Sequence, residues 1–198
     1  MKNIYAFFIS IVSLSMAHAQ EHKPELLKQP ANWEFERFNL PPGFAPGITY
    51  KGAEELRFAP GMFHKDSANY FTYVFVAQLD DVSAISQTDI RDYLLKYYKG
   101  LCQVTAKDRK LVIDTNQVTV AIEKQQNAPG KETIYNALAN IFGVFADGAP
   151  VKLNIEIKAL INTARKRGYL LFIASPRERT DAIWQTLYRI QKEFTMPD

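Results

Sequence analysis

The chain has 198 residues, with 24 Lys and Arg against 21 Asp and Glu, and a formal net charge of +3. This near balance argues against a nucleic-acid-binding protein, which usually carries a strong basic excess. The length suits one domain with a substantial core, and the single cysteine, Cys102, excludes an internal disulfide. Stability must therefore come from apolar burial, and we interpret Cys102 as a small core residue.

The N-terminus has the features of a secretory signal peptide. Lys2 supplies a positive charge, and residues 4–16 form an apolar run that is too short to span a bilayer. The small-x-small pattern at 17–19 predicts cleavage after Ala19, so that 1–19 is the signal peptide. We expect an exported protein, periplasmic or extracellular, with no transmembrane span after cleavage. A retained membrane anchor is the alternative.

Residues 20–47 are typical of an extended leader followed by an aromatic arm. The leader is polar, and Trp33, Phe35 and Phe38 then alternate loosely with charged residues. Prolines and glycines between 41 and 47 interrupt regular structure. We expect the arm to cross the surface and to be held there by its aromatic side chains. The remainder, 48–198, is predicted to be a single α+β domain.

Alternation of apolar residues with a period of two predicts most of the strands of that domain. The strand at 70–79 is apolar on both faces, so we expect it to be covered on both sides, and the compact apolar run at 169–174 is expected to be central. The predicted strands are 55–58, 70–79, 110–113, 118–123, 138–145, 151–158 and 169–174, and 48–50 is a candidate for a further short strand.

The clearest local signal is a hairpin between the strands at 138–145 and 151–158. Gly148 can take a positive φ and Pro150 cannot donate a hydrogen bond to a central strand, so the turn is expected at 147–150. The stretch at 132–137 either extends the first strand or forms a short helix.

Two amphipathic helices are expected to pack on this sheet. The first starts at Ser86, which forms a capping-box pattern with Asp89, and its apolar spacing continues to about residue 103 unless Gly100 ends it earlier. The second follows Thr180 as N-cap and carries an apolar stripe widened by Trp184. About seven strands joined mainly by short connections predict an α+β fold with a mainly antiparallel sheet.

Two stretches carry a family resemblance. The sequence at 52–63 (GAEELRFAPGMF), followed by YFTYVF at 70–75, resembles a block in a family of uncharacterised exported bacterial proteins. The resemblance implies a small secreted domain and transfers no catalytic residue. The order of strands and helices is also similar to that of the PsbP-like sandwich, which is a likeness of fold and carries no function.

The candidate binding residues are Glu55, Arg57 and His64. Glu54, Glu55 and Arg57 lie among apolar residues, and if buried they would need partners and could mark a pocket. The favoured interpretation is that Glu55 and Arg57 share a solvent-facing side, with Leu56 on the other. His64 lies in a loop whose neighbouring polar residues are too close in sequence for a typical catalytic triad.

No pattern indicates a catalytic, metal or cofactor site. The spacing of His and Cys resembles no zinc motif, and no glycine-rich phosphate loop is present. The leading hypothesis is a non-catalytic exported domain that binds a protein or a small ligand in the cell envelope, with the arm at 33–44 as the candidate for the binding patch. The alternatives are a hydrolase with a site near Glu55, Arg57 and His64, and a structural subunit of an envelope complex.

Overall fold

A computed structural model of the chain describes residues 25–126 and 133–197. Its elements, in chain order, are β1 (Glu34–Leu40), β2 (Gly52–Phe58), β3 (Tyr73–Asp80), α2 (Gln87–Asp108), the 3-10 helix η2 (Thr115–Gln117), β4 (Thr119–Lys124), β5 (Thr133–Phe142), β6 (Pro150–Asn162), β7 (Arg167–Ser175) and α3 (Ala182–Glu193). The expected signal peptide at 1–19 and most of the polar loop between β4 and β5 lie outside the described residues.

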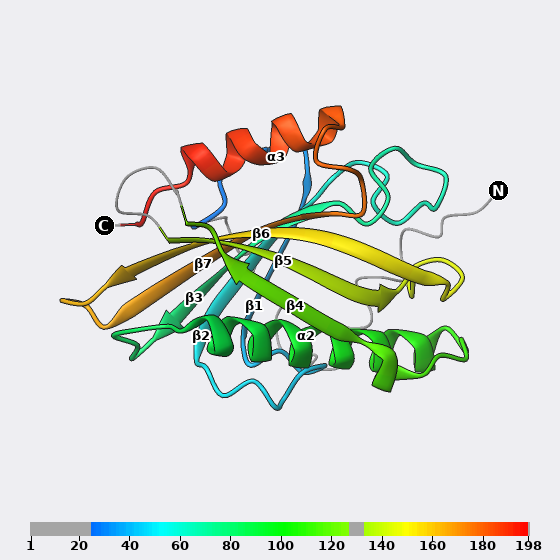
Figure 1. Cartoon of the computed structure of the whole chain (residues 1–198), viewed down its shortest axis with the longest axis horizontal. Helices are drawn as coiled ribbons and strands as arrows, with labels where there is room; N and C mark the ends of the chain where they lie inside the picture. Colours follow the sequence, from blue (N-terminus) through cyan, green and yellow to red (C-terminus); the bar gives the residue numbers. More distant parts are fainter. Residues whose placement is uncertain (1–24, 127–132, 198) are drawn as a thin grey trace, which may run out of the picture.

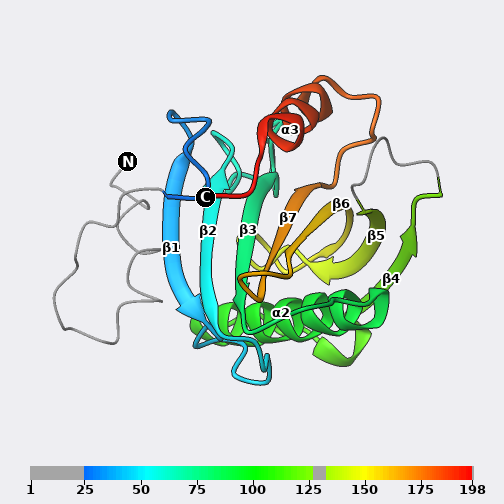
Figure 2. The same ribbon diagram turned by 90° about the vertical axis from the view of Figure 1, so that its left-hand side faces the viewer.

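The strands form one antiparallel sheet of seven, in the order β1-β2-β3-β7-β6-β5-β4. Helix α2 covers one face and α3 the other (Figure 1). Seen along the sheet, the strands run from β1 to β4 with α2 below and α3 above (Figure 2). The predicted α+β class, with a mainly antiparallel sheet and two packed helices, is confirmed.

The larger part of the core lies between the sheet and α2. Phe75 and Phe172 stand opposite each other on β3 and β7, and their rings stack with centroids 4.1 Å apart. Tyr97 of α2 stacks on Phe75 from the helix side at 5.4 Å. Burying each such aromatic side chain stabilises the fold by roughly 1.5–3 kcal/mol.

A second core lies between the sheet and α3. Val74 and Val76 of β3 and Ile173 of β7 pack there against Trp184 and Leu187 of the helix, and all five are fully buried. Because β3 also contributes to the first core, it is covered on both faces as predicted. The predicted central position of the strand at 169–174 is confirmed by β7, the fourth strand of seven.

Helix α2 begins as the sequence predicts and ends later. The Ser86 side chain accepts from the backbone N–H of Asp89, and the Asp89 carboxylate accepts from the backbone N–H of Ser86, which confirms the capping box. Gly100 does not end the helix, which continues to Asp108. The buried position of Cys102 inside α2 confirms it as a core residue, and burial raises the pKa of its thiol to about 11.

Several expectations for local structure were wrong, including the N-cap of α3, which is Asp181 and not Thr180. Part of the arm forms the edge strand β1, because its alternating residues pair with β2 from Glu34 opposite Phe58 to Leu40 opposite Gly52. The stretch at 110–113 is not a strand, since the backbone N–H of Leu111 donates to a carbonyl of α2 and closes the helix end. Residues 48–50 form no strand either.

Gly100 allows the loop before β2 to touch α2. A Cβ on Gly100 would lie 2.0 Å from the backbone oxygen of Phe44. We expect Gly100→Ala to lower the free energy of unfolding by about 1–3 kcal/mol through overpacking, despite the better helix propensity of alanine. Urea denaturation measures the change, and Gly43→Ala is the control because no atom lies within 4 Å of its added Cβ. A Gly100→Ala variant as stable as the parent would contradict the expectation.

Candidate functional site

Glu55 is buried on the α3 face of the sheet, where it holds the segment 25–33. Its Oε1 accepts from the backbone N–H of Glu25 at 2.9 Å and from Arg37 at 2.7 Å. Its Oε2 accepts from the backbone N–H groups of Leu26 and Leu27 at 2.9 and 2.8 Å. Both carboxylate oxygens are therefore occupied by the chain itself.

Arg57 holds the same segment by donating hydrogen bonds to backbone carbonyl groups of that segment. The guanidinium donates to the backbone oxygens of Leu27 at 2.9 Å and Trp33 at 3.1 Å, and it lies over the Phe35 ring at 4.7 Å. Arg57 is 4 % exposed and Glu55 is fully buried, so the favoured interpretation that they face solvent was wrong. The reason is that 25–33, expected as flexible leader and surface arm, covers this face with the side chains of Leu27 and Trp33.

His64 lies apart from these contacts, on the exposed loop between β2 and β3. Its backbone groups close turns with Gly61 and Ser67. Glu55 and Arg57 both bind the segment 25–33, whereas His64 belongs to the loop between β2 and β3. This placement lends no support to a hydrolase site built from the three residues.

A concave apolar site lies on the opposite face, between the β1 edge of the sheet and the second half of α2. We call it the aromatic pocket. Its volume is about 50 Å³, and its walls come from β1, β2, β3, α2 and three connecting segments. Principal wall residues are Phe38, Phe44, Phe58, Tyr73, Tyr97 and Val104.

Among the residues that the structure describes, Glu36 of β1 is the only charged one that lines the aromatic pocket. Within the described part of the chain, no hydrogen bond or ion pair reaches its carboxylate. Burial raises the pKa of Glu36 above its ordinary value. A carboxylate in an apolar wall costs free energy unless a partner compensates it, so the geometry leaves this group available to a ligand.

A second carboxyl group, that of Glu54 on β2, lies on the same face of the sheet and is fully buried. Its Oε2 accepts from the Tyr93 hydroxyl at 2.5 Å, while its Oε1 has no hydrogen-bond partner. Burial raises the pKa of Glu54 to about 8, the bond from Tyr93 opposes the rise, and the nearby charge of Glu36 adds to it. Glu54 is therefore protonated over most of the neutral pH range.

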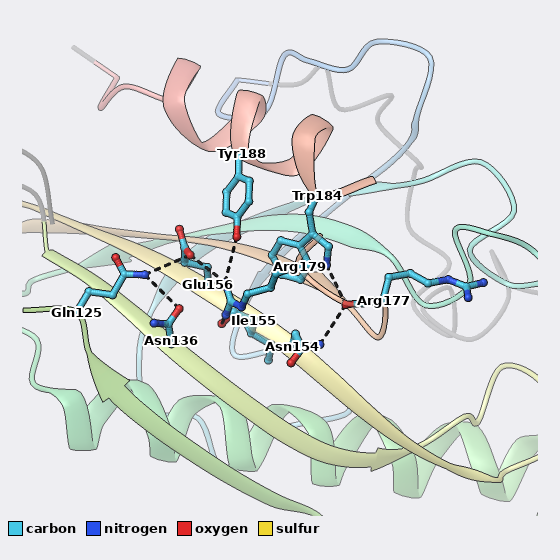
Figure 3. Close-up of polar contacts among 9 residues, drawn as sticks. All are labelled: Gln125, Asn136, Asn154, Ile155, Glu156, Arg177, Arg179, Trp184 and Tyr188. Atoms are coloured by element: carbon cyan, nitrogen blue, oxygen red, sulfur yellow. Dashed lines mark hydrogen bonds and ion pairs between the residues drawn. The ribbon is translucent and has the colours of Figure 1, made fainter. Parts of the chain in front are cut away.

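The polar cluster on the α3 face has a structural role. Glu156 of β6 accepts from Arg179 at 3.0 Å, and the Arg179 guanidinium lies 4.9 Å from the centre of the Trp184 ring (Figure 3). Asn154 and the Trp184 indole both donate to the backbone oxygen of Arg177. Because these bonds join the β7–α3 connection to the sheet, they fix the position of α3.

In the described ranges, no group of three or more His, Cys, Asp or Glu residues is placed to hold a metal ion. Over the same residues, no helix is both long and apolar enough to cross a membrane. The chain matches no protein-family model, no curated protein and no solved structure. The function must therefore be inferred from the geometry of the aromatic pocket.

The aromatic arm carries a partial signal for this pocket. Phe38 and Phe44 belong to the arm that was expected to present an aromatic patch, and both line the pocket. Trp33 of the same arm is instead buried against α3. Glu36 was not singled out, although an acid between Phe35 and Phe38 on an alternating stretch is a usable signal.

Proposed function

We propose that this chain is an exported, non-catalytic domain of the cell envelope that binds a small ligand through the aromatic pocket. The observation that carries the proposal is a concave site with aromatic walls and one unpartnered carboxylate, Glu36. Sites for small ligands combine apolar walls with few polar groups in this way. The signal-peptide pattern at 1–19 supports export.

The size of the pocket limits what it accepts. A cavity of about 150 Å³ holds one benzene molecule, and this pocket of about 50 Å³ is smaller but open. It therefore takes the apolar end of a ligand, while the rest of the ligand lies across the rim.

A small ligand is favoured over a protein partner by the surface of the domain. Stable protein interfaces bury about 800 Å² on each partner around an apolar centre. Among the described residues, the large hydrophobic side chains that are mostly exposed are Val112 and Met196. Scattered exposure of this kind does not form an apolar protein-binding patch.

Filling the pocket tests the proposal. Val104 lines it on α2, and we expect Val104→Trp to abolish binding of benzyl alcohol, used as a neutral aromatic probe. Binding of so small a probe is expected on the order of millimolar and is measured by NMR chemical-shift changes of pocket residues.

Val112→Trp is the matched control, because Val112 is 101 % exposed and lies outside the pocket. It should bind the probe as the parent does. Thermal unfolding of both variants checks that they fold. Shift changes confined to residues outside the pocket, or equal binding by the Val104→Trp variant, would overturn the proposal.

A further inference from the structure

The charges around the aromatic pocket have one sign. Among the described residues, its lining contains Glu36 and no Lys, Arg or His. Glu54, on the same face of the sheet, is protonated at neutral pH, and the charge of Glu36 helps to keep it so. No basic side chain of the described chain forms an ion pair with either acid.

Three other acids of the sheet do have basic partners. Glu55 pairs with Arg37, Glu156 with Arg179 and Asp80 with Arg167. Arg37 is adjacent to Glu36 in sequence, but β-strand alternation sends it to the opposite face, where it is held by Glu55. The protein therefore supplies a positive charge to the acids on one face of β1 and β2 and supplies none to the pocket.

The aromatic walls favour the same ligand chemistry. Phe38, Phe44 and Tyr97 form a continuous set of edge contacts, with ring centroids 6.0 and 5.0 Å apart. Aromatic faces attract cations within about 6 Å of the ring centre, and the attraction grows when the cation is partly removed from water. A carboxylate and aromatic rings at one site together select a positive charge on an apolar body.

From this geometry we propose that the ligand of the aromatic pocket is an organic ammonium ion, whose charge pairs with the Glu36 carboxylate and whose apolar end enters the pocket. The inference rests on the proposed function and adds the chemical class of the ligand. An anionic ligand is disfavoured by Glu36, and a neutral ligand leaves that carboxylate unpaired in an apolar wall.

Three probes of nearly equal size test the inference, namely benzylammonium, benzyl alcohol and benzoate. We expect benzylammonium to bind at least tenfold more tightly than benzyl alcohol, and benzoate to show no binding, by NMR titration at neutral pH and low salt. Glu36→Gln should remove the preference, so that the ammonium and the alcohol bind within about twofold of each other.

Glu34→Gln is the matched control. Glu34 lies on the same strand and the same side as Glu36, but it is exposed and outside the pocket lining. Glu34→Gln removes one negative charge, as Glu36→Gln does. The ratio of benzylammonium to benzyl alcohol affinity should nevertheless stay within about twofold of the ratio in the parent.

The outcomes separate the two proposals. Equal binding of benzylammonium and benzyl alcohol by the parent overturns the cation inference and leaves the binding function standing. A preference that persists in Glu36→Gln, or disappears in Glu34→Gln, overturns the assignment of Glu36 as the counter-ion. Failure of all three probes to bind overturns the proposed function itself.

Discussion

Replacing Glu55 by alanine is expected to lower the free energy of unfolding by about 3–5 kcal/mol, the range for removing one partner of a buried ion pair. The substitution leaves three consecutive backbone N–H groups, those of residues 25–27, without their acceptor. It also leaves Arg37 without its buried partner. Urea denaturation followed by tryptophan fluorescence measures the loss, because Trp33 and Trp184 are both buried.

Glu25→Ala is the control for this experiment. Glu25 forms an ion pair with the same Arg37 at 3.0 Å, but its side chain is 70 % exposed. Exposed pairs contribute about 0–1 kcal/mol, so the control should change stability by no more than that. Limited proteolysis adds a local measurement, since the Glu55→Ala variant should be cut within 25–33 before the rest of the domain is attacked. Equal effects of the two substitutions would show that Glu55 does not hold this segment.

Glu54→Gln is expected to make the protein more stable at alkaline pH and to have little effect in acid. The pKa of Glu54 is about 8 in the folded protein against an ordinary value of 4.5, so the folded state keeps a proton that the unfolded state loses. The contribution of protonated Glu54 to the free energy of unfolding is fully present below pH 4.5 and is lost as the pH rises to about 8. A shift of this size corresponds to at most about 5 kcal/mol, at 1.36 kcal/mol for each pH unit.

The difference between the parent and Glu54→Gln isolates this effect from the other titrating groups. Free energies of unfolding at pH 4.5, 6, 7 and 8.5 should diverge progressively in favour of the variant. The groups that face Glu54 are Glu36 on β1 and the hydroxyls of Tyr93 and Tyr97 on α2, and burial raises the pKa of both tyrosines. These phenols therefore stay neutral throughout that range.

Tyr93→Phe provides an independent check. Tyr93 and Tyr97 both lower the pKa of Glu54, and this variant removes the contribution of Tyr93, so the pH dependence should extend to higher pH than in the parent. A difference between parent and Glu54→Gln that is constant with pH would mean that Glu54 does not titrate in this range.

Local signals in the sequence were sufficient for much of the fold. The capping box at Ser86, the alternation at 151–158 and the doubly apolar strand β3 each depend on residues close together in the chain, and each was confirmed. The edge strand β1 was missed because its pairing with β2 is not encoded within either segment alone.

The candidate site was harder to predict because its parts are distant in sequence. Strand alternation places the side chains of Glu54 and Glu55 on opposite faces of β2. It does not tell which face is covered, or which segment of the chain covers it. The cover over Glu55 comes from 25–33, and that over Glu54 from α2. Prediction of a solvent-facing Glu55 failed for this reason, and the aromatic pocket likewise needs three strands, one helix and three connections to be in place.

The strand order also determines when the domain can finish folding. β1, β2 and β3 form one set of neighbours and β4 to β7 another, and the two sets meet only where β3 pairs with β7. During synthesis, β3 keeps a bare hydrogen-bonding edge until the ribosome has passed Ser175, near the end of the chain. Such distant pairs slow folding, and bare apolar edges promote aggregation. A chain that lacks β7 therefore exposes the unpaired edge of β3 to pairing with other chains.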